Sequence, residues 1–332
     1  MTAPITEIPP ASSRAKFRDG FGQRFLVTVD TEEEFDWEKP IAREGFSLHH
    51  VPRLKTFQQF CESEGVSPLY LVDWPIATSS LAADILRDPV REGKAEIGVQ
   101  LHPWVNPPFE EEVSERNSYA GNLPRELEHA KFRCLRKTIE ERFETLPRAY
   151  RAGRYGVGAH TVDVLRECGI AIDTSVRAKF DYSAAGGANF RDHPLYPYWL
   201  DDAHSVLELP LTTVFWGILR KHGDMLHPAM WRFPRLRGAL TRMGLLERIP
   251  LTPEGVSVEE VIRGIDIAID DGLPLLVLSF HSPSLEPGHT PYVREERDLE
   301  ALYDWWRRVF AYLDQRGIAP TTAKEIVEAV EV

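Results

Sequence analysis

The feature of this sequence that most constrains its fold is an alternation of short apolar runs with longer amphipathic segments. The seven runs have the near-continuous apolar character of strands that are covered on both faces. They are RFLVTVD (24–30), PLYLVD (68–73), AEIGVQLH (95–102), RAYRAG (148–153), IAIDTS (170–175), VLELPL (206–211) and PLLVLSFH (274–281). This alternation is typical of β/α units and predicts an α/β protein with seven strands in a parallel sheet or barrel.

Six segments between these runs have a helical pattern. They cover residues 51–64, 81–92, 124–144, 159–168, 257–271 and 295–316. The fifth is the best marked, because Ser257 and Glu260 have the spacing of a capping box and Gly272 stands where a helix would end. Segment 225–249 mixes Trp, Arg and Pro. It is either an excursion that covers the barrel or a partner surface, and we favour the first.

The size and charge of the chain bound its domains and its partners. A chain of 332 residues with 43% hydrophobic residues can bury one large core. We expect a flexible N-terminal segment over residues 1–20 and a single domain over residues 21–332. The formal charge of −12 comes from 51 acidic and 39 basic residues, without any Lys/Arg block. This balance argues against nucleic acid and leaves a small molecule or an oligosaccharide as the expected partner.

The cysteines and the N-terminus bear on the cellular compartment. Cys61, Cys134 and Cys168 are widely spaced without a CxxC pair, so we expect reduced, buried thiols. The first residues lack the apolar region of a signal peptide, and no stretch approaches the ~20 apolar residues of a membrane span. The sequence therefore predicts a cytoplasmic protein without a transmembrane segment, and it leaves the oligomeric state open.

The reactive side chains share one kind of position. Asp30, His102, Arg151, Asp173 and His281 all lie at or just beyond the C-terminal end of an apolar run. Barrel enzymes assemble their sites from several loops at that edge of the sheet. We therefore predict that these side chains surround one pocket.

The first run ends in two carboxylates that point the same way. Asp30 and Glu32 are two residues apart, and such residues share a side of an extended chain. They could converge on one cation, or one could hold a metal while its neighbour takes a proton. Glu33 and Glu34 fit a solvated acidic loop instead.

The third run offers further candidate ligands. His102 stands at the strand exit, and a neutral imidazole is a good ligand for a divalent metal. The amide oxygen of Asn106 could be a weaker metal ligand. Gln100 faces the same side as His102 by strand alternation and could contact the substrate. Trp104 lies near the predicted mouth, where an indole could stack on a sugar ring.

Two later segments supply charge, backbone donors and an acid. Arg151 could fix a carboxylate base in its ionised form. The glycines of RAGRYG (151–156) allow backbone N–H groups to approach a developing oxyanion. His281 ends the last run, and an imidazole held there by a carboxylate would be a protonated acid suited to a departing amine.

In this order, the motifs resemble those of the NodB-like polysaccharide deacetylases, carbohydrate esterase family 4, and especially their WalW-like branch. The resemblance covers roughly residues 24–330, and QLHPWVNPP (100–108) and HSPSLEPGHTPYV (281–293) are its most specific stretches. It implies a distorted, TIM-like (β/α)7 barrel. It also implies hydrolysis of N-acetyl groups on sugars with one divalent metal, usually zinc, held by a carboxylate and two histidines.

The resemblance implies a role for each motif residue. Asp30 is similar to the base that activates water, Glu32 to the carboxylate ligand and His102 to a histidine ligand. Metal and base would together make water attack the acyl carbon.

The other motifs carry the remaining roles. Arg151 resembles the arginine that steers the base, and Tyr155 the aromatic residue whose backbone amide helps to form the oxyanion hole. Asp173 resembles the partner of the acid, and His281 the general acid itself.

Two departures from the family pattern leave alternatives open. Gln100 and Trp104 occupy positions where the family has histidines, and the first motif is Asp-x-Glu where most members have adjacent aspartates. The second departure leaves open whether Asp30 or Glu32 is the base. The main hypothesis is a deacetylase that acts on a sugar or sugar-nucleotide precursor of a surface polysaccharide. The alternatives are a hydrolase of a non-sugar, including cyclic, amide, and a carbohydrate-binding barrel that has lost metal and turnover.

Overall fold

The structure is a computed structural model that describes residues 4–35, 39–231, 238 and 243–331. Its main sheet has the order β10-β1-β2-β3-β4-β5-β7-β6, with β11 beside β1. The strands are β1 (Arg24–Thr31), β2 (Leu69–Val72), β3 (Glu96–Leu101), β4 (Ala149–Ala152), β5 (Ile172–Asp173), β6 (Tyr198–Trp199), β7 (Leu207–Glu208), β10 (Leu275–His281) and β11 (Ala319–Pro320). Apart from the antiparallel pair of β6 and β7, the neighbouring strands are parallel.

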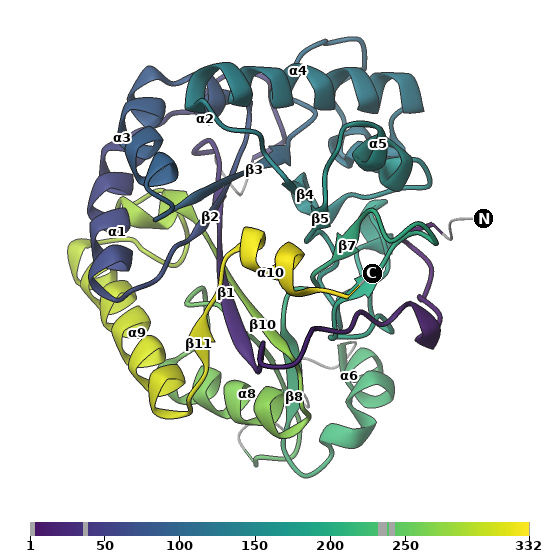
Figure 1. The fold of residues 1–332 in the computed structure, drawn as a ribbon, viewed down its shortest axis with the longest axis vertical. Coiled ribbons are helices and arrows are strands. Elements are labelled where there is room, and N and C mark those ends of the chain that lie inside the picture. The colour runs from purple at the N-terminus through teal and green to yellow at the C-terminus, as the bar shows by residue number, and fades with distance from the viewer. Residues whose placement is uncertain (1–3, 36–38, 232–237, 239–242, 332) are drawn as a thin grey trace.

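The seven predicted runs are confirmed as β1, β2, β3, β4, β5, β7 and β10, and the sheet they form is curled into a distorted barrel (Figure 1). The gap between β7 and β10 is bridged by single hydrogen bonds. Thr212 N–H donates to Val277 O at 3.2 Å, Leu251 N–H to Thr212 O at 3.0 Å, and Ser279 N–H to Leu251 O at 3.2 Å. The barrel is therefore distorted because irregular backbone, not a regular strand, closes it.

A small antiparallel hairpin continues from this closing segment. It consists of β8 (Thr213–Trp216) and β9 (Glu247–Pro250), and Thr213 pairs with Pro250. The sequence analysis did not predict either strand, because both runs are only four residues long and β9 carries two charged residues at the end of the mixed segment 225–249. Part of that segment lies outside the described residues.

The helices surround the sheet. They are α1 (Val51–Ser63), α2 (Trp74–Thr78), α3 (Ser80–Arg91), α4 (Arg125–Phe143), α5 (Thr161–Glu167), α6 (Gly223–Trp231), α8 (Val258–Asp270), α9 (Glu296–Gln315) and α10 (Ala323–Ala329). The six predicted helices are confirmed as α1, α3, α4, α5, α8 and α9. The capping box of Ser257 and Glu260 at the start of α8 is also present. Among the described residues, no helix is long and apolar enough to cross a membrane.

Short 3-10 turns occupy the loops. They are η1 (Ala11–Ser13), η2 (Arg116–Ser118), η3 (Ala120–Asn122), η4 (Gly153–Tyr155), η5 (Ser183–Ala185), η6 (Arg220–His222) and η7 (Ser282–Leu285). Two of them matter for the site, because η4 follows β4 and η7 follows β10.

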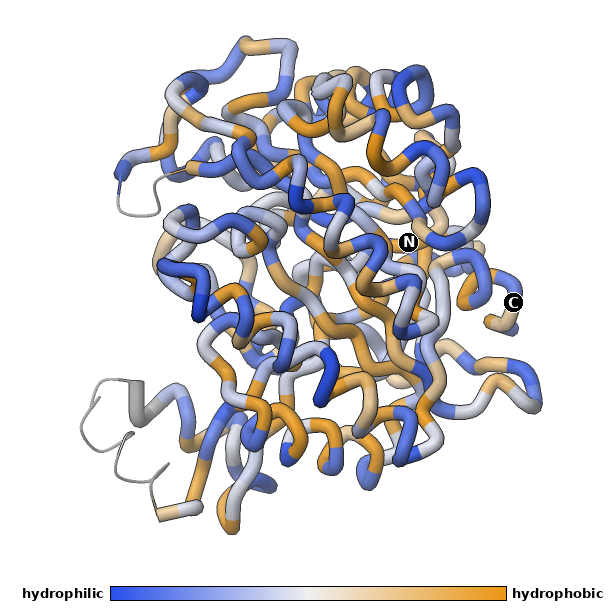
Figure 2. Tube along the Cα trace, turned by 90° about the vertical axis from the view of Figure 1, so that its left-hand side faces the viewer, coloured by the Kyte–Doolittle hydropathy of each residue, from blue (hydrophilic) through white to orange (hydrophobic). Residues whose placement is uncertain are grey.

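Apolar side chains fill the space between strands and helices, and Figure 2 shows the hydrophobic residues concentrated along the strands and inner helix faces. Phe57 of α1, Phe280 of β10 and Trp306 of α9 are all buried and pack together. The ring centroids of Phe57 and Phe280 are 4.9 Å apart, and those of Phe280 and Trp306 are 5.5 Å apart. This aromatic cluster fixes β10 against its covering helices, and β10 carries His281 at its end.

The N-terminal end of the barrel is closed by α10 and by described residues of the segment that precedes β1 (Figure 1). Glu96, at the start of β3, accepts the backbone N–H groups of Ala323 and Lys324 at the beginning of α10. Phe17 pairs with Val330, and Ile5 is buried. Residues of the segment that was predicted as flexible therefore contact the barrel, and the flexibility of residues 1–20 stays a prediction.

Candidate active site

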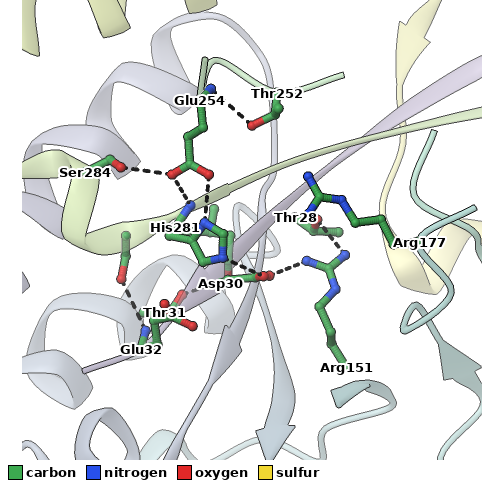
Figure 3. A network of polar contacts seen from close by, with 12 residues as sticks. Thr28, Asp30, Thr31, Glu32, Arg151, Arg177, Thr252, Glu254, His281 and Ser284 are labelled. Carbon is green, nitrogen blue, oxygen red and sulfur yellow. Dashed lines mark hydrogen bonds and ion pairs between the residues drawn. The ribbon is translucent and has the colours of Figure 1, made fainter. Parts of the chain in front are cut away.

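Asp30 and His281 come together because they end two neighbouring parallel strands. They are paired in the register of β1 and β10. Their side chains meet with 3.6 Å between His281 Nε2 and Asp30 Oδ2, as Figure 3 shows. The Asp30 side chain is 3% exposed and the His281 side chain is 21% exposed. The pair therefore lies at the C-terminal end of the barrel, with the imidazole on the solvent side.

Arg151 holds the other oxygen of Asp30. Its guanidinium is fully buried on β4 and forms an ion pair with Asp30 Oδ1. The remaining donors are also engaged: Nη2 donates to Thr28 Oγ1 at 2.9 Å and Nε donates to Thr174 O at 2.9 Å. A guanidinium cannot lose its proton under ordinary conditions. This fixed positive charge therefore orients the Asp30 carboxylate.

Glu32 and His102 face each other beside this pair. Glu32 Oε2 lies 3.4 Å from His102 Nε2. Burial raises the pKa of the Glu32 carboxyl to about 8, although the neighbouring His281 and His102 act in the opposite direction. A divalent cation between Glu32 and His102 would stabilise the ionised carboxylate that burial alone disfavours.

The far side of the His102 ring is held by Glu33. His102 Nδ1 lies 2.8 Å from Glu33 Oε2, and Trp104 Nε1 donates to Glu33 Oε1 at 2.8 Å. The Trp104 ring also stacks on the imidazole, with 4.4 Å between centroids. Asp73 lies behind them, and its Oδ2 accepts the backbone N–H of Glu33 at 2.9 Å. This support shell fixes the direction of the imidazole.

The prediction that Glu33 and Glu34 belong to a solvated acidic loop is wrong, because both side chains are buried. Burial raises the pKa of Glu33, while hydrogen bonds from its neighbours counteract this shift. Burial and the nearby charge of Glu33 raise the pKa of Asp73 well above its usual range. The sequence analysis missed both residues as part of the site. Their signal was position, since Asp73 ends the second run and Glu33 follows the first.

The two ring nitrogens of His102 face different groups of potential metal ligands. On the Nδ1 side, Glu33, Asp73 and His102 have ligand atoms within 4.8 Å of one another. However, each oxygen of Glu33 and Asp73 already meets an N–H donor. With Nδ1 directed at Glu33, the lone pair of Nε2 is directed at Glu32. A carboxylate behind a metal-binding imidazole is the usual support for such a ligand.

The carboxylate that holds His281 is Glu254, not the predicted Asp173. His281 Nδ1 lies 2.7 Å from Glu254 Oε2, and Ser284 Oγ donates to Glu254 Oε1 at 2.9 Å. Burial alone would lower the pKa of His281, but the charges of Glu254 and Glu32 outweigh it and raise this pKa to about 10. His281 is therefore an imidazolium at neutral pH.

Asp173 has a different environment. It is buried on β5, accepts a hydrogen bond from Ser175 Oγ at 2.6 Å, and pairs with Glu208 of β7 in the sheet register. Burial raises the pKa of Asp173, and burial together with the charge of Asp173 raises that of Glu208 well above its usual range. Asp173 therefore belongs to a buried acid pair behind Arg151. Glu254 was missed because it follows β9 and the closing segment, which were not predicted as strands.

The RAGRYG segment forms a tight turn against His102. Gly153 is required there, because a Cβ at this position would lie 2.3 Å from His102 Cδ2 and 2.7 Å from Leu101 O. Arg154 and Tyr155 follow with φ of 55° and 59°, a region that non-glycine residues seldom adopt. Such conformations cluster at functional sites. Arg177 lies over the Tyr155 ring, 5.2 Å from its centroid.

Comparison with solved structures identifies the fold around this site. A Mycobacterium smegmatis protein with a provisional assignment as a polysaccharide deacetylase matches with a TM-score of 0.53 and 19% identity, over 97% of this chain and 94% of the other. The 4-α-glucanotransferase of Thermococcus litoralis matches with a TM-score of 0.53 and 14% identity, over 92% of this chain and 40% of the other. This chain has the polysaccharide deacetylase fold. No family model and no curated protein matches the sequence.

Within this fold, the surroundings of Trp104 and Asn106 bear on their predicted roles. Trp104 was predicted as a sugar platform, but it is buried against His102 and Glu33. Asn106 was predicted as a metal ligand through its amide oxygen. Its Nδ2 donates to Pro107 O at 2.7 Å and to Lys131 O at 2.9 Å, whereas its buried Oδ1 has no hydrogen-bond partner among the described residues. The ligand role of Asn106 therefore stays a prediction.

Gln100 remains a candidate for ligand contact. It is buried on β3, next to Arg151 in the register of β4. In the part of the chain that the structure describes, its Oε1 has no hydrogen-bond partner. A buried acceptor without a donor is costly in a folded protein and calls for a partner from outside the chain.

Proposed function

We propose that this protein is a metal-dependent hydrolase that removes an acyl group, most simply acetyl, from an N-acylated sugar or polysaccharide precursor. The observation that carries the proposal is the convergence of Glu32 and His102, 3.4 Å apart, with Asp30 and His281, 3.6 Å apart, at one end of the barrel. A ligand pair beside a base and an acid is the set of groups that metal-assisted hydrolysis needs. The fold shared with a deacetylase supports the choice of substrate.

Glu32 Oε2 and His102 Nε2 would hold the divalent metal, and zinc suits a mixed oxygen and imidazole donor set. The bound metal would supply Lewis acidity toward the acyl oxygen and make water more acidic. Gln100 replaces a histidine of the family pattern, so its unpartnered Oε1 is assigned to the substrate side. The Tyr155 backbone amide, at the strained turn after β4, is assigned to the developing oxyanion.

Asp30 is assigned as the base that takes the proton of the attacking water. Its contacts separate it from Glu32, because Asp30 meets Arg151 and His281 whereas Glu32 meets His102. Arg151 keeps the base oriented during the attack. This division of contacts supports Asp30, and not Glu32, as the base.

His281 is assigned as the acid that gives a proton to the departing amine. Its Nε2 faces the site and its Nδ1 is held by Glu254. The raised pKa of about 10 keeps the proton available at neutral pH. The amine leaves as a neutral molecule only if this proton arrives as the C–N bond breaks.

Measurement of acetate release tests the proposal. Protein stripped by a chelator and reloaded with Zn²⁺ or Co²⁺ should release acetate from N-acetylhexosamine oligomers. Asp30→Asn and His281→Ala should each lower kcat by about 10²-fold or more. The control is His160→Ala, at an exposed histidine. Wild-type activity in both variants would reject these roles.

The outcome also separates the two other functions. Turnover of cyclic or non-sugar amides, without turnover of N-acetyl sugars, would identify an amidase with the same site. Sugar binding without turnover and without metal at the site of Glu32 and His102 would identify a binding protein, and in that case the proposed function fails.

A further inference from the structure

A second group of potential metal ligands lies on the same rim of the barrel, apart from the proposed catalytic pair. Glu34 follows β1, His49 precedes α1, and His289 lies in the loop between η7 and α9. Glu34 Oε2 is 3.1 Å from His49 Nδ1 and 3.2 Å from His289 Nδ1, and the three atoms lie within 4.8 Å of one another. We propose that these residues bind a second divalent transition-metal ion, for which zinc is the best match.

The hydrogen-bond requirements around Glu34 argue for a cation. Oε1 of Glu34 already meets the backbone N–H and Nδ1 of His50. Oε2 meets Ser47 Oγ in addition to the His49 and His289 nitrogens. A carboxylate oxygen offers about two lone-pair positions, and three polar groups crowd Oε2. A cation among Oε2 and the two imidazoles relieves this crowding, because both imidazoles then present lone pairs.

The spacing and the chemistry of the ligands agree with zinc. Ligand atoms at about 2.0–2.2 Å from zinc are separated by about 3.3–3.6 Å at tetrahedral angles. The separations from Glu34 Oε2, 3.1 and 3.2 Å, lie a few tenths of an ångström below this range, so a small movement of the two solvent-accessible imidazoles would admit the ion. Two histidines and one glutamate with an open fourth position form a ligand set that zinc uses in proteins. Calcium and magnesium prefer sites made of oxygen atoms alone.

One ligand of the proposed site is buried, and the other two are accessible to solvent. The Glu34 side chain is 2% exposed, whereas those of His289 and His49 are 27% and 70% exposed. His50 fixes Glu34 through two contacts, as a supporting residue does behind a metal ligand. A metal ion could therefore enter from solvent and bind to a carboxylate that is already oriented.

A chain of hydrogen bonds joins this rim to the catalytic residues. His50 Nε2 lies 2.9 Å from Ser282 Oγ, and Ser282 Oγ accepts the backbone N–H of Glu32 at 3.3 Å. The second metal would thus fasten the loop after β1 to the loop after β10. The first loop carries Glu32, and the second follows His281. The role of the second metal would therefore be to fix the mouth of the candidate active site.

Metal stoichiometry tests the inference in the full chain. Apoprotein would be titrated with Co²⁺, followed by its visible absorption, and metal content would be measured after removal of excess ion. His49→Asn/His289→Asn should bind one equivalent less than the wild type. Glu32→Gln/His102→Asn should lose the other equivalent. The control is His160→Asn/His222→Asn, at two exposed histidines, which should keep the wild-type stoichiometry.

Thermal unfolding supplies a second measurement. Zn²⁺ should raise the Tm of Glu32→Gln/His102→Asn, since a ligand of the folded state stabilises it, and should not do so when His49 and His289 are also replaced. If the catalytic pair binds no metal, the wild type should bind one equivalent and His49→Asn/His289→Asn none, which rejects the proposed function and supports this site. Unchanged stoichiometry in His49→Asn/His289→Asn would overturn the inference.

Discussion

The two histidines of the candidate active site have the same kind of partner but different surroundings. His102 Nδ1 lies 2.8 Å from Glu33, and His281 Nδ1 lies 2.7 Å from Glu254. His102 is enclosed by the Trp104 ring and faces a single carboxylate, Glu32, across Nε2. His281 is partly exposed and faces Asp30.

The difference shows how one pair of groups can serve two roles. Glu33 is buried beside Asp73, which accepts its backbone N–H, and its Oε1 accepts a hydrogen bond from Trp104 Nε1. Glu33 therefore mainly orients the His102 ring. Glu254 acts on His281 mainly through charge, because with Glu32 and Asp30 it raises the pKa of the imidazole to about 10. Orientation suits a metal ligand, whereas charge suits an acid.

The largest effect is expected where charge is removed. Glu254→Gln keeps an acceptor near His281 Nδ1 but removes a carboxylate that raises the pKa of His281. Activity requires the protonated imidazole and is lost as pH rises through its pKa, so the basic limb should move to lower pH. Each unit by which this pKa falls lowers the protonated fraction tenfold on the alkaline side, so kcat should fall by about 10-fold or more at alkaline pH, although Glu32 and Asp30 still face the imidazole.

The pH profile separates this cause from simple structural damage. At about pH 6 the imidazole is largely protonated in both proteins, so the difference should shrink to a few-fold. Glu300→Gln, at an exposed glutamate, serves as the matched control. An equal loss at both pH values would show that Glu254 acts through geometry and not through charge.

A smaller effect is expected where orientation is disturbed. Glu33→Gln leaves one acceptor for two donors, His102 Nδ1 and Trp104 Nε1. The metal concentration that half-activates the apoprotein should rise about 10- to 100-fold, as for other residues that support a metal ligand. At saturating metal, kcat should return to near the wild-type value. A lasting loss of kcat with unchanged metal dependence would contradict the supporting role of Glu33.

The contrast between the two histidines also marks what the sequence could predict. The continuous apolar runs predicted seven strands, and the residues at their ends placed Asp30, Arg151, His102 and His281 on one rim, because parallel strands end together. Glu254 was not predicted as a site residue. The barrel closes near it through isolated hydrogen bonds at Thr212, and such backbone produces no periodic pattern of apolar residues in the sequence.

The burial of the charged loop after β1 was the second feature that could not be predicted from the sequence. Glu33 and Glu34 were predicted to lie in a solvated loop, but they and Glu32 have side chains that contact three different sets of partners. Glu32 meets His102, Glu33 meets Asp73 and Trp104, and Glu34 meets His50. These partners lie far away along the chain, so only the folded structure reveals that each carboxylate is enclosed.

The smallest effect is expected for Trp104→Phe, which keeps an aromatic ring beside His102 but removes the donor to Glu33 Oε1. The freed oxygen is buried, so the free energy of unfolding should fall by about 1–3 kcal/mol in denaturant titrations. Glu33 still accepts from His102 Nδ1, so half-activation by metal should change by no more than a few-fold. Because Trp104 lies behind the imidazole, KM for an N-acetyl sugar should stay unchanged. A large rise in KM would instead return Trp104 to the substrate side, as the sequence first suggested.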